Sequence, residues 1–157
     1  MFVSKLGCIA AFLLGLFVFV PSAGSAQDAD LQGRLAAFDE ALSSAWAGDD
    51  VDALASHFTE DALYWPPEGE TLRGRDEIRA WLAQLGKTES LKIEPLWSER
   101  IGDHVLYFGN FEQDLELRGR PLVYRGGFMA LLADTPDGLK IHRLTSFAER
   151  KPMEPPE

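Results

Sequence analysis

The spacing of apolar residues changes once along this chain, near Thr88, and this change limits the possible folds more than any other feature. Before Thr88 apolar residues recur every three or four positions, which is the spacing of one face of an α-helix. After Thr88 they alternate with polar residues, which is typical of strands joined by turns. Helices followed by hairpin-linked strands predict an α+β domain, a cone in which a curved antiparallel sheet wraps around the N-terminal helices.

The stretch from Gly48 to Gly86 holds two short helical patterns around a short extended run at 62–65. Gly48 predicts the end of the first long helix, and Asp49 or Asp50 predicts the N-cap of the next. The second helix is expected to carry, at helical spacing, Val51, Leu54 and Phe58. Two helices beside an aromatic strand are expected to wall one side of a pocket.

The strand region contains two expected irregularities. Pro95 interrupts an alternating pattern, which predicts a bulge or an edge strand, because proline cannot donate a ladder hydrogen bond. A long strand is expected at 122–133, with a bulge or sharp bend at Gly126 and Gly127. The last strand is expected at 139–147.

The N-terminus has the pattern of a secretory signal peptide at 1–26. A short basic segment precedes an apolar run at 6–20, and small residues follow at 21–26. The alternative is a membrane anchor, but the run has about 15 residues against the roughly 20 that a span needs. The domain is therefore expected at 27–150, followed by a disordered Pro-rich tail at 151–157.

Composition narrows the function classes. The formal net charge of −10 argues against binding to nucleic acid, or to an anionic membrane after signal cleavage. Cys8 is the only cysteine and lies in the predicted signal. An exported domain without cysteines is expected in the bacterial periplasm or secreted, the periplasm fitting better. The three histidines show no metal-ligand spacing and no nucleotide loop occurs, so no metal or cofactor is predicted.

Several motifs resemble one known family. They are G-D-D-V-D-A-L-A-S-H-F-T-E-D-A-L-Y at 48–64, P-P-E-G at 66–69, G-R-D-E-I at 74–78, R-G-G-F-M-A-L at 125–131 and D-G-L-K-I-H at 137–142. The chain is similar to the SnoaL-like branch of the nuclear transport factor 2-like superfamily of cystatin-like cones. That family includes ketosteroid isomerases, polyketide cyclases, scytalone dehydratases and epoxide hydrolases, and also non-catalytic binding domains. The resemblance implies a homodimer through the outer face of the sheet, where we expect Leu106, Phe108 and Met129.

Arg125 is the most prominent candidate site residue, because it stands inside the apolar run L-V-Y-R-G-G-F-M-A-L-L. A buried arginine must pair with a carboxylate or contact a ligand. Glu112 and Asp114 on the neighbouring strand are its expected partners. The alternative to a ligand contact is a structural ion pair. The adjacent glycines favour the ligand contact, since they allow close approach of another group.

Three further residues are candidates for proton transfer or polarisation. Tyr64 is expected to donate to a ligand carbonyl, with a plain core position as the alternative. His142 faces away from the cavity if Ile141 faces the core, and a bulge would reverse this. Arg125 and Tyr64 would orient the ligand, and Asp114 or His142 would move the proton. The residues expected to contact the ligand are Trp65, Trp81, Tyr107, Phe111, Phe128 and Thr145.

These observations lead to two hypotheses about function. The first is an exported domain that binds a small apolar, carbonyl-bearing molecule and isomerises, cyclises or dehydrates it by proton transfer without a cofactor. The second is a non-catalytic ligand carrier or dimerisation domain. An inward carboxylate or histidine in the cavity favours the enzyme, whereas a purely aromatic and aliphatic lining favours the carrier.

Overall fold

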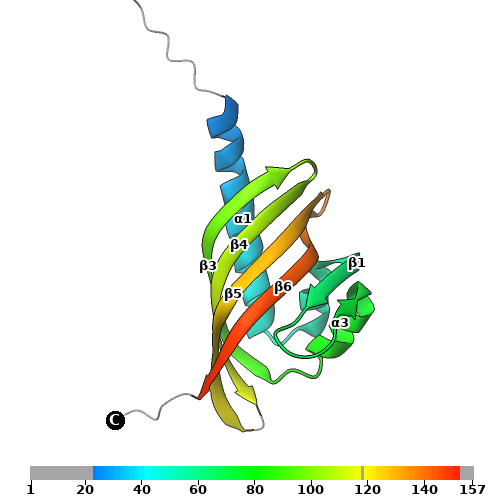
Figure 1. Cartoon of the computed structure of the whole chain (residues 1–157), viewed down its shortest axis with the longest axis vertical. Helices are drawn as coiled ribbons and strands as arrows, with labels where there is room; N and C mark the ends of the chain where they lie inside the picture. The colour runs from blue at the N-terminus through cyan, green and yellow to red at the C-terminus, as the bar shows by residue number, and fades with distance from the viewer. Residues whose placement is uncertain (1–22, 118, 153–157) are drawn as a thin grey trace, which may run out of the picture.

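The computed structural model describes residues 23–117 and 119–152 (Figure 1). The elements are α1 (Ala23–Ala47), α2 (Val51–Ser56), β1 (Phe58–Trp65), β2 (Leu72–Arg73), α3 (Gly74–Leu82), β3 (Lys87–Ile101), β4 (His104–Leu117), β5 (Arg120–Thr135) and β6 (Gly138–Pro152). The predicted order of helices and hairpin-linked strands is confirmed, with β1 and β2 placed between the helices.

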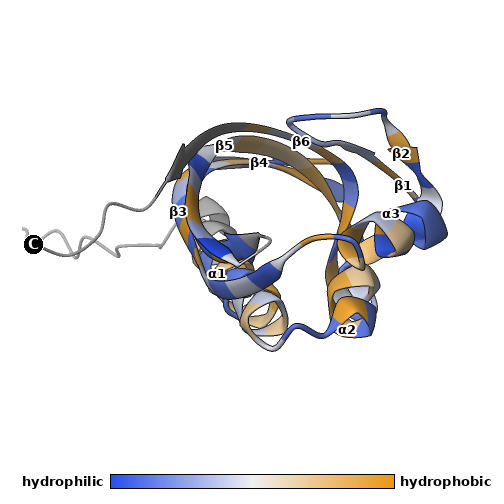
Figure 2. Cartoon of the chain, turned by 90° about the horizontal axis from the view of Figure 1, so that it is seen from below, coloured by the Kyte–Doolittle hydropathy of each residue, from blue (hydrophilic) through white to orange (hydrophobic). Residues whose placement is uncertain are grey.

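The strands form one six-stranded sheet in the order β2-β1-β6-β5-β4-β3. All neighbouring strands run antiparallel except β1 and β6, which are parallel. The sheet is curved and does not close on itself, and Figure 2 shows β3 to β6 arching over α1. The predicted curved sheet around N-terminal helices is therefore confirmed.

Helix α1 packs its apolar stripe against the concave face of this sheet. Leu31, Leu35 and Phe38 recur at helical spacing and are buried in the core. On the same helix, Arg34 forms a bidentate ion pair with Asp134 of β5. Arg100 of β3 donates to the same carboxylate at 2.9 Å. Apolar burial and an ion-pair network therefore hold α1 on the sheet.

The start of the second helix agrees with expectation and its end does not. Asp50 is the N-cap, and its carboxylate accepts a hydrogen bond from the Ala53 backbone at 2.9 Å. Phe58 does not belong to α2 but begins β1, where it pairs with Ile141 of β6. The prediction placed Phe58 in the helix because it lies four residues after Leu54. Burial of Phe58 in a parallel strand pair outweighs that spacing.

The two expected irregularities have different outcomes. Pro95 coincides with a register shift between β3 and β4, and β3 is an edge strand, so that prediction is confirmed. The bulge expected at Gly126 and Gly127 is wrong, because both residues pair in register with β4 and β6. Partners on both sides hold the register there. The shift instead lies where Leu131 and Leu132 meet β6, with His142 as the additional residue.

The first helix and the last strand both extend past the expected domain limits of 27 and 150. Most of the predicted signal peptide, 1–22, lies outside the described residues, and α1 begins inside the expected cleavage zone at 21–26. No helix within 23–117 or 119–152 is long and apolar enough to cross a membrane. Strand β6 continues to Pro152 and so includes the start of the expected tail, and residues 153–157 lie outside the described part.

Candidate functional site

A cavity of about 330 Å³ lies between the helices and the concave face of the sheet. Its wall comes from α1, α3, β1 and strands β3 to β6. Most of the lining is aromatic or aliphatic, because these side chains are the inward-facing set of each element. The aromatic lining residues are Phe38, Trp46, Tyr64, Trp81, Tyr107, Phe111, Tyr124 and Phe128. A space of this size suits a small organic molecule.

One carboxylate belongs to this apolar wall. Asp39 of α1 lines the cavity beside Phe38. Its Oδ2 accepts a hydrogen bond from the Tyr107 hydroxyl at 2.6 Å. Its Oδ1 is buried and has no hydrogen-bond partner, which holds for no other buried side-chain oxygen or nitrogen in the described residues. Buried polar atoms are normally paired, so this orphan oxygen calls for an explanation.

Burial changes the acid–base properties of this pair. It raises the pKa of Asp39, and the hydrogen bond from Tyr107 opposes the rise only in part. Burial also raises the pKa of Tyr107, and the neighbouring Asp39 carboxylate raises it further. Tyr107 therefore remains a hydrogen-bond donor near neutral pH, and Asp39 is a stronger base than an exposed aspartate.

A second polar pair lines the same cavity. The hydroxyls of Tyr64 and Ser146 lie 3.1 Å apart, and either of them can donate to the other. Burial raises the pKa of Tyr64, which therefore keeps its proton. Two hydroxyls have two donor protons and use one of them in this hydrogen bond. One O–H group of the pair is therefore left to donate to a ligand.

Residues 39–138 match the family model of the SnoaL-like domain, which covers more than half of the chain. The protein belongs to the SnoaL-like family. No curated protein sequence matches it significantly.

Several solved structures share this fold. A Mycobacterium tuberculosis protein of unknown function superposes with a TM-score of 0.69 at 17% identity, over 81% of this chain and 76% of its own. A putative aromatic ring hydroxylase from Novosphingobium aromaticivorans gives 0.67 at 18% identity, over 77% and 94%. A ketosteroid isomerase-like protein from Erwinia carotovora gives 0.59 at 17% identity, over 76% and 94%. At these identities the likeness shows the shared fold.

Several residues expected at the site do line the cavity of this SnoaL-like domain. They are Tyr64, Trp81, Tyr107, Phe111 and Phe128. Phe111 and Tyr107 face inward because they share one face of β4, and Phe128 packs edge-on against Tyr107 at a ring distance of 5.2 Å. Their contact with a ligand stays a prediction.

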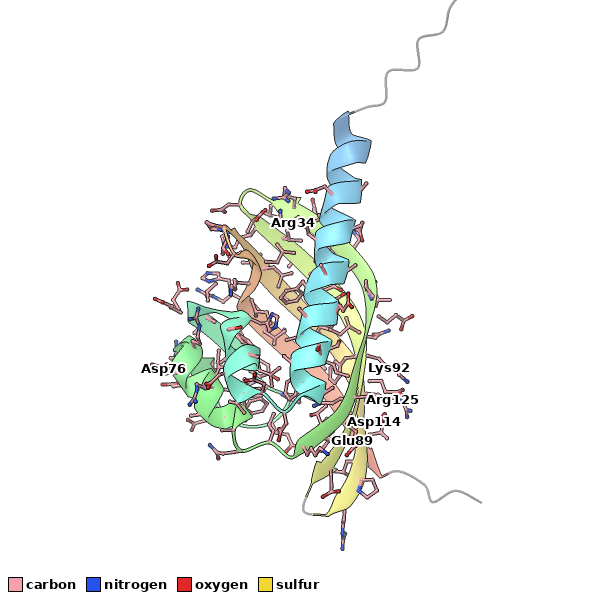
Figure 3. The ribbon with its side chains drawn as sticks, turned by 180° about the vertical axis from the view of Figure 1, so that it is seen from behind. Arg34, Asp76, Glu89, Lys92, Asp114 and Arg125 are labelled. Carbon is pink, nitrogen blue, oxygen red and sulfur yellow. The ribbon has the colours of Figure 1, made fainter. Side chains whose placement is uncertain are left out.

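Arg125 and Asp114 lie outside the cavity, so their expected inward position is wrong. The Arg125 side chain is 54% exposed, and its Nε donates to Glu112 at 2.6 Å. Asp114 accepts a hydrogen bond from Ser90 at 2.8 Å. Figure 3 shows Arg125 and Asp114 on the side of the sheet away from α1. Residues 112 and 114 alternate with the inward-facing Phe111 and Gln113, which explains their outward position.

The bulge at His142 determines the orientation of β6. Leu144 and Ser146 line the cavity, whereas Thr145 does not, so the expected inward position of Thr145 is wrong. Trp65, which pairs with Thr145, is 43% exposed and also lies outside the cavity. One additional residue in β6 reverses the alternation that a regular strand would have continued from Ile141.

His142 does not reach the cavity either. Its Nδ1 lies 3.2 Å from the Thr59 hydroxyl and 3.4 Å from the Asp61 carboxylate, and its ring lies 5.4 Å from that of His104. Burial, followed by the charge of Arg143, lowers the pKa of His142. Nowhere in 23–117 or 119–152 do three or more potential ligand side chains of His, Cys, Asp or Glu form a group that could hold a metal ion.

Asp39 was not identified from the sequence, because only the apolar residues of the first helix were interpreted as facing the core. A signal for it exists in the sequence. It follows Leu35 by four residues and Phe38 by one, so it lies beside the apolar stripe of α1. A charged residue next to such a stripe faces the core side and needs a partner or a function.

Proposed function

We propose that this SnoaL-like protein binds a small, largely apolar molecule in its cavity and moves a proton with Asp39 as the base. The observation that carries the proposal is the Asp39 carboxylate, which lines an aromatic cavity and has one oxygen without a partner. An inward carboxylate favours an enzyme over a carrier with a purely apolar lining. Exclusion of water and a raised pKa both make such a carboxylate an effective base.

The geometry suggests how the proton transfer proceeds. The Asp39 carboxylate takes a proton from a ligand carbon next to a carbonyl group. Tyr107 holds Oδ2 and thereby orients the carboxylate. The remaining hydroxyl proton of the Tyr64 and Ser146 pair donates to the carbonyl oxygen, where negative charge develops. Return of the proton from Asp39 to another carbon completes an isomerisation. If the neighbouring carbon carries a hydroxyl group, return of the proton to that departing oxygen releases water and completes a dehydration.

The base can be tested without knowledge of the natural substrate. A base that removes the ring C–H proton of a nitrobenzisoxazole breaks its N–O bond and releases a coloured cyanophenolate. The wild-type protein should accelerate this reaction, and Asp39→Asn should lower the rate by about 100-fold or more. Glu40→Gln is the matched control, because it removes the same charge at the next, exposed position of α1.

Two outcomes would contradict the proposed role of Asp39 as the base. One is an Asp39→Asn variant as active as Glu40→Gln. The other is a wild-type protein that binds the probe but does not accelerate its opening, which would favour the carrier.

We also propose that the outer face of the sheet forms a homodimer interface. Met129 is 39% exposed there, and Phe108 packs at a tilt against Trp97 with a ring distance of 5.5 Å. Phe147 is 64% exposed in the neighbouring strand. Exposed apolar patches commonly mark interfaces. Light scattering at micromolar concentration should give the mass of two chains, and Met129→Lys should give one.

Export remains a proposal that rests on the pattern of residues 1–26. Mass spectrometry of the protein from its native cells should find a chain that begins near Gln27 in the exported fraction. A chain that keeps 1–26 in the cytosol would overturn it.

A further inference from the structure

We infer that Gly109 is a positioning residue for the proposed base. Its missing side chain lets the Phe128 ring lie against β4, and that ring in turn holds Tyr107 in line with Asp39. This inference rests on the proposed function and explains how the fold orients the carboxylate that the function uses.

Gly109 lies in β4 at a place where no side chain fits. A Cβ atom at this position would lie 2.6 Å and 2.7 Å from Cε1 and Cζ of the Phe128 ring, and 2.8 Å from the carbonyl oxygen of Glu94. Carbon atoms that are not bonded to each other prefer separations of about 3.5–4.0 Å. The φ angle of Gly109 is not positive, so the backbone conformation does not require glycine. Glycine in a strand has an entropic cost, and here it marks a close approach of another group.

The close approach follows from the strand pairing. Gly109 lies between Tyr107 and Phe111 in the inward-facing alternation of β4. Phe128 of β5 is the register partner of Gly109 and lines the same cavity. Its ring therefore occupies the space that a side chain at position 109 would fill. Gly127, the preceding residue of β5, provides a contrast, because a Cβ atom there would lie 3.6 Å from its nearest neighbour, which is an ordinary contact.

In this position the Phe128 ring packs against Tyr107. The two ring centroids are 5.2 Å apart and the ring planes meet at 68°, an edge-to-face arrangement that aromatic pairs prefer. Tyr107 is 1% exposed, and its hydroxyl donates to Asp39 of α1 at 2.6 Å. A hydrogen bond weakens when its donor turns out of line. The ring that fixes the tilt of Tyr107 therefore also fixes the hydrogen bond between β4 and α1.

The consequence can be measured at Asp39. Burial raises the pKa of Asp39, and the hydrogen bond from Tyr107 opposes the rise. The other titratable residues of the cavity wall, among those that the structure describes, are Tyr64, Glu68 and Tyr124. A weaker hydrogen bond should raise the pKa of Asp39 further, whereas water admitted by a smaller side chain should lower it. The two effects have opposite signs, so the direction of the change distinguishes them.

The test is a pH titration of the Asp39 carboxyl carbon by nuclear magnetic resonance, with aspartate labelled at that carbon. The signal of Asp39 is the one that Asp39→Asn lacks. Phe128→Leu should raise its titration midpoint by about half a pH unit or more, and Tyr107→Phe should raise it at least as much. In the Tyr107→Phe background, Phe128→Leu should cause no further rise. Phe111→Leu is the matched control and should leave the midpoint unchanged, because it shortens an aromatic side chain of the same wall other than the one that packs on Tyr107.

Gly109→Ala tests the glycine itself. Its methyl group should displace the Phe128 ring and raise the midpoint as Phe128→Leu does. Gly127→Ala is the control, because its methyl group makes only an ordinary contact, and it should leave the midpoint unchanged. The methyl group at position 109 would also meet the Glu94 carbonyl, so Phe128→Leu, which adds no atom there, carries the test if Gly109→Ala does not fold.

Three results would overturn the inference. They are an unchanged midpoint in Phe128→Leu, a lower midpoint in that variant, and an equal rise in Phe111→Leu. The rate of nitrobenzisoxazole opening separates this inference from the proposed function. A midpoint that rises in Phe128→Leu, with a rate that Asp39→Asn does not lower, would keep the positioning and lose the base. A rate that depends on Asp39, with an unchanged midpoint in Phe128→Leu, would keep the base and lose the positioning.

Discussion

Two carboxylates connect helix α1 to the sheet, and they differ in how completely they are paired. Asp134 on β5 accepts hydrogen bonds from Arg34 and Arg100. Those guanidinium groups, Arg34 first, hold the pKa of Asp134 far below its usual range. Asp39 on α1 has one neutral donor, Tyr107, and its pKa is raised by burial. Asp134 therefore stabilises the fold. Burial of the charged Asp39 destabilises it, because no neighbouring cation compensates the loss of hydration among the described residues.

This difference indicates which carboxylate is available for chemistry. A carboxylate held by two arginines is a weak base, and both of its oxygens already accept hydrogen bonds. A buried carboxylate with an orphan oxygen is a stronger base, and that oxygen is open to a ligand. Proteins keep such unfavourable groups mainly where function needs them, so the cost of Asp39 supports its role in the cavity.

Exchanging each carboxylate for its amide should give opposite effects on stability. Asp134→Asn leaves Arg34 and Arg100 without their anion and should lower the free energy of unfolding by about 1.5–3 kcal/mol. Asp39→Asn removes a buried charge and should leave the protein at least as stable near neutral pH. Urea denaturation of both variants measures the difference. An Asp39→Asn variant that loses as much stability as Asp134→Asn would make Asp39 a structural residue.

A second substitution removes the Tyr107 hydroxyl, which donates the hydrogen bond to Asp39. Tyr107→Phe leaves Asp39 with no partner on either oxygen and should cost about 1–3 kcal/mol. Tyr64→Phe is the matched control, because the lost partner is the neutral Ser146 hydroxyl, and it should cost about 0.5–1.5 kcal/mol. Denaturation midpoints rank the two variants. Equal losses would mean that the hydrogen bond to Asp39 has no special strength.

The fold could be predicted from the sequence because its elements depend on local patterns. The stripe of α1, the cap at Asp50 and the interruption at Pro95 each have a local physical cause. The orientation of strand residues could not be predicted equally well. One additional residue at His142 moves Ser146 inward and Thr145 outward. No glycine or proline in that part of the sequence predicts the bulge.

The candidate site was only partly predictable for the same reason. The aromatic lining follows from apolar positions, which face inward in any cone. Arg125 was expected inside because its run is apolar, but a strand alternates its faces, and Arg125 has the outward parity between the inward Tyr124 and Phe128. Asp39 and Tyr107 are 68 residues apart, so their hydrogen bond emerges only when α1 lies on β4.

The two carboxylates should also respond to pH with opposite signs. The pKa of Asp39 is higher in the folded than in the unfolded state, so its contribution is full below about pH 4 and is lost as pH rises through the folded pKa. The pKa of Asp134 is lower in the folded state, so its contribution is full above about pH 4 and is lost in acid.

The measurement is the free energy of unfolding at a series of acid and neutral pH values. The difference between the wild type and each amide variant gives the slope of that carboxylate's contribution to stability against pH. Each unit of pKa difference contributes about 1.4 kcal/mol. Slopes of the same sign would show that the fold stabilises the charged form of Asp39 and does not disfavour it.

The smallest effect is expected from Arg125, the residue that the sequence pointed to first. If it were buried against a carboxylate, Arg125→Met would strand that carboxylate and lower the melting temperature markedly. If it contacted a ligand, the change would weaken binding instead. In the structure its guanidinium is exposed, Glu112 keeps Lys92 at 3.7 Å as a second partner, and neither lines the cavity. We therefore expect an unchanged melting temperature and an unchanged rate of nitrobenzisoxazole opening. A lower rate in Arg125→Met with a normal melting temperature would show that the outer face of the sheet influences the cavity.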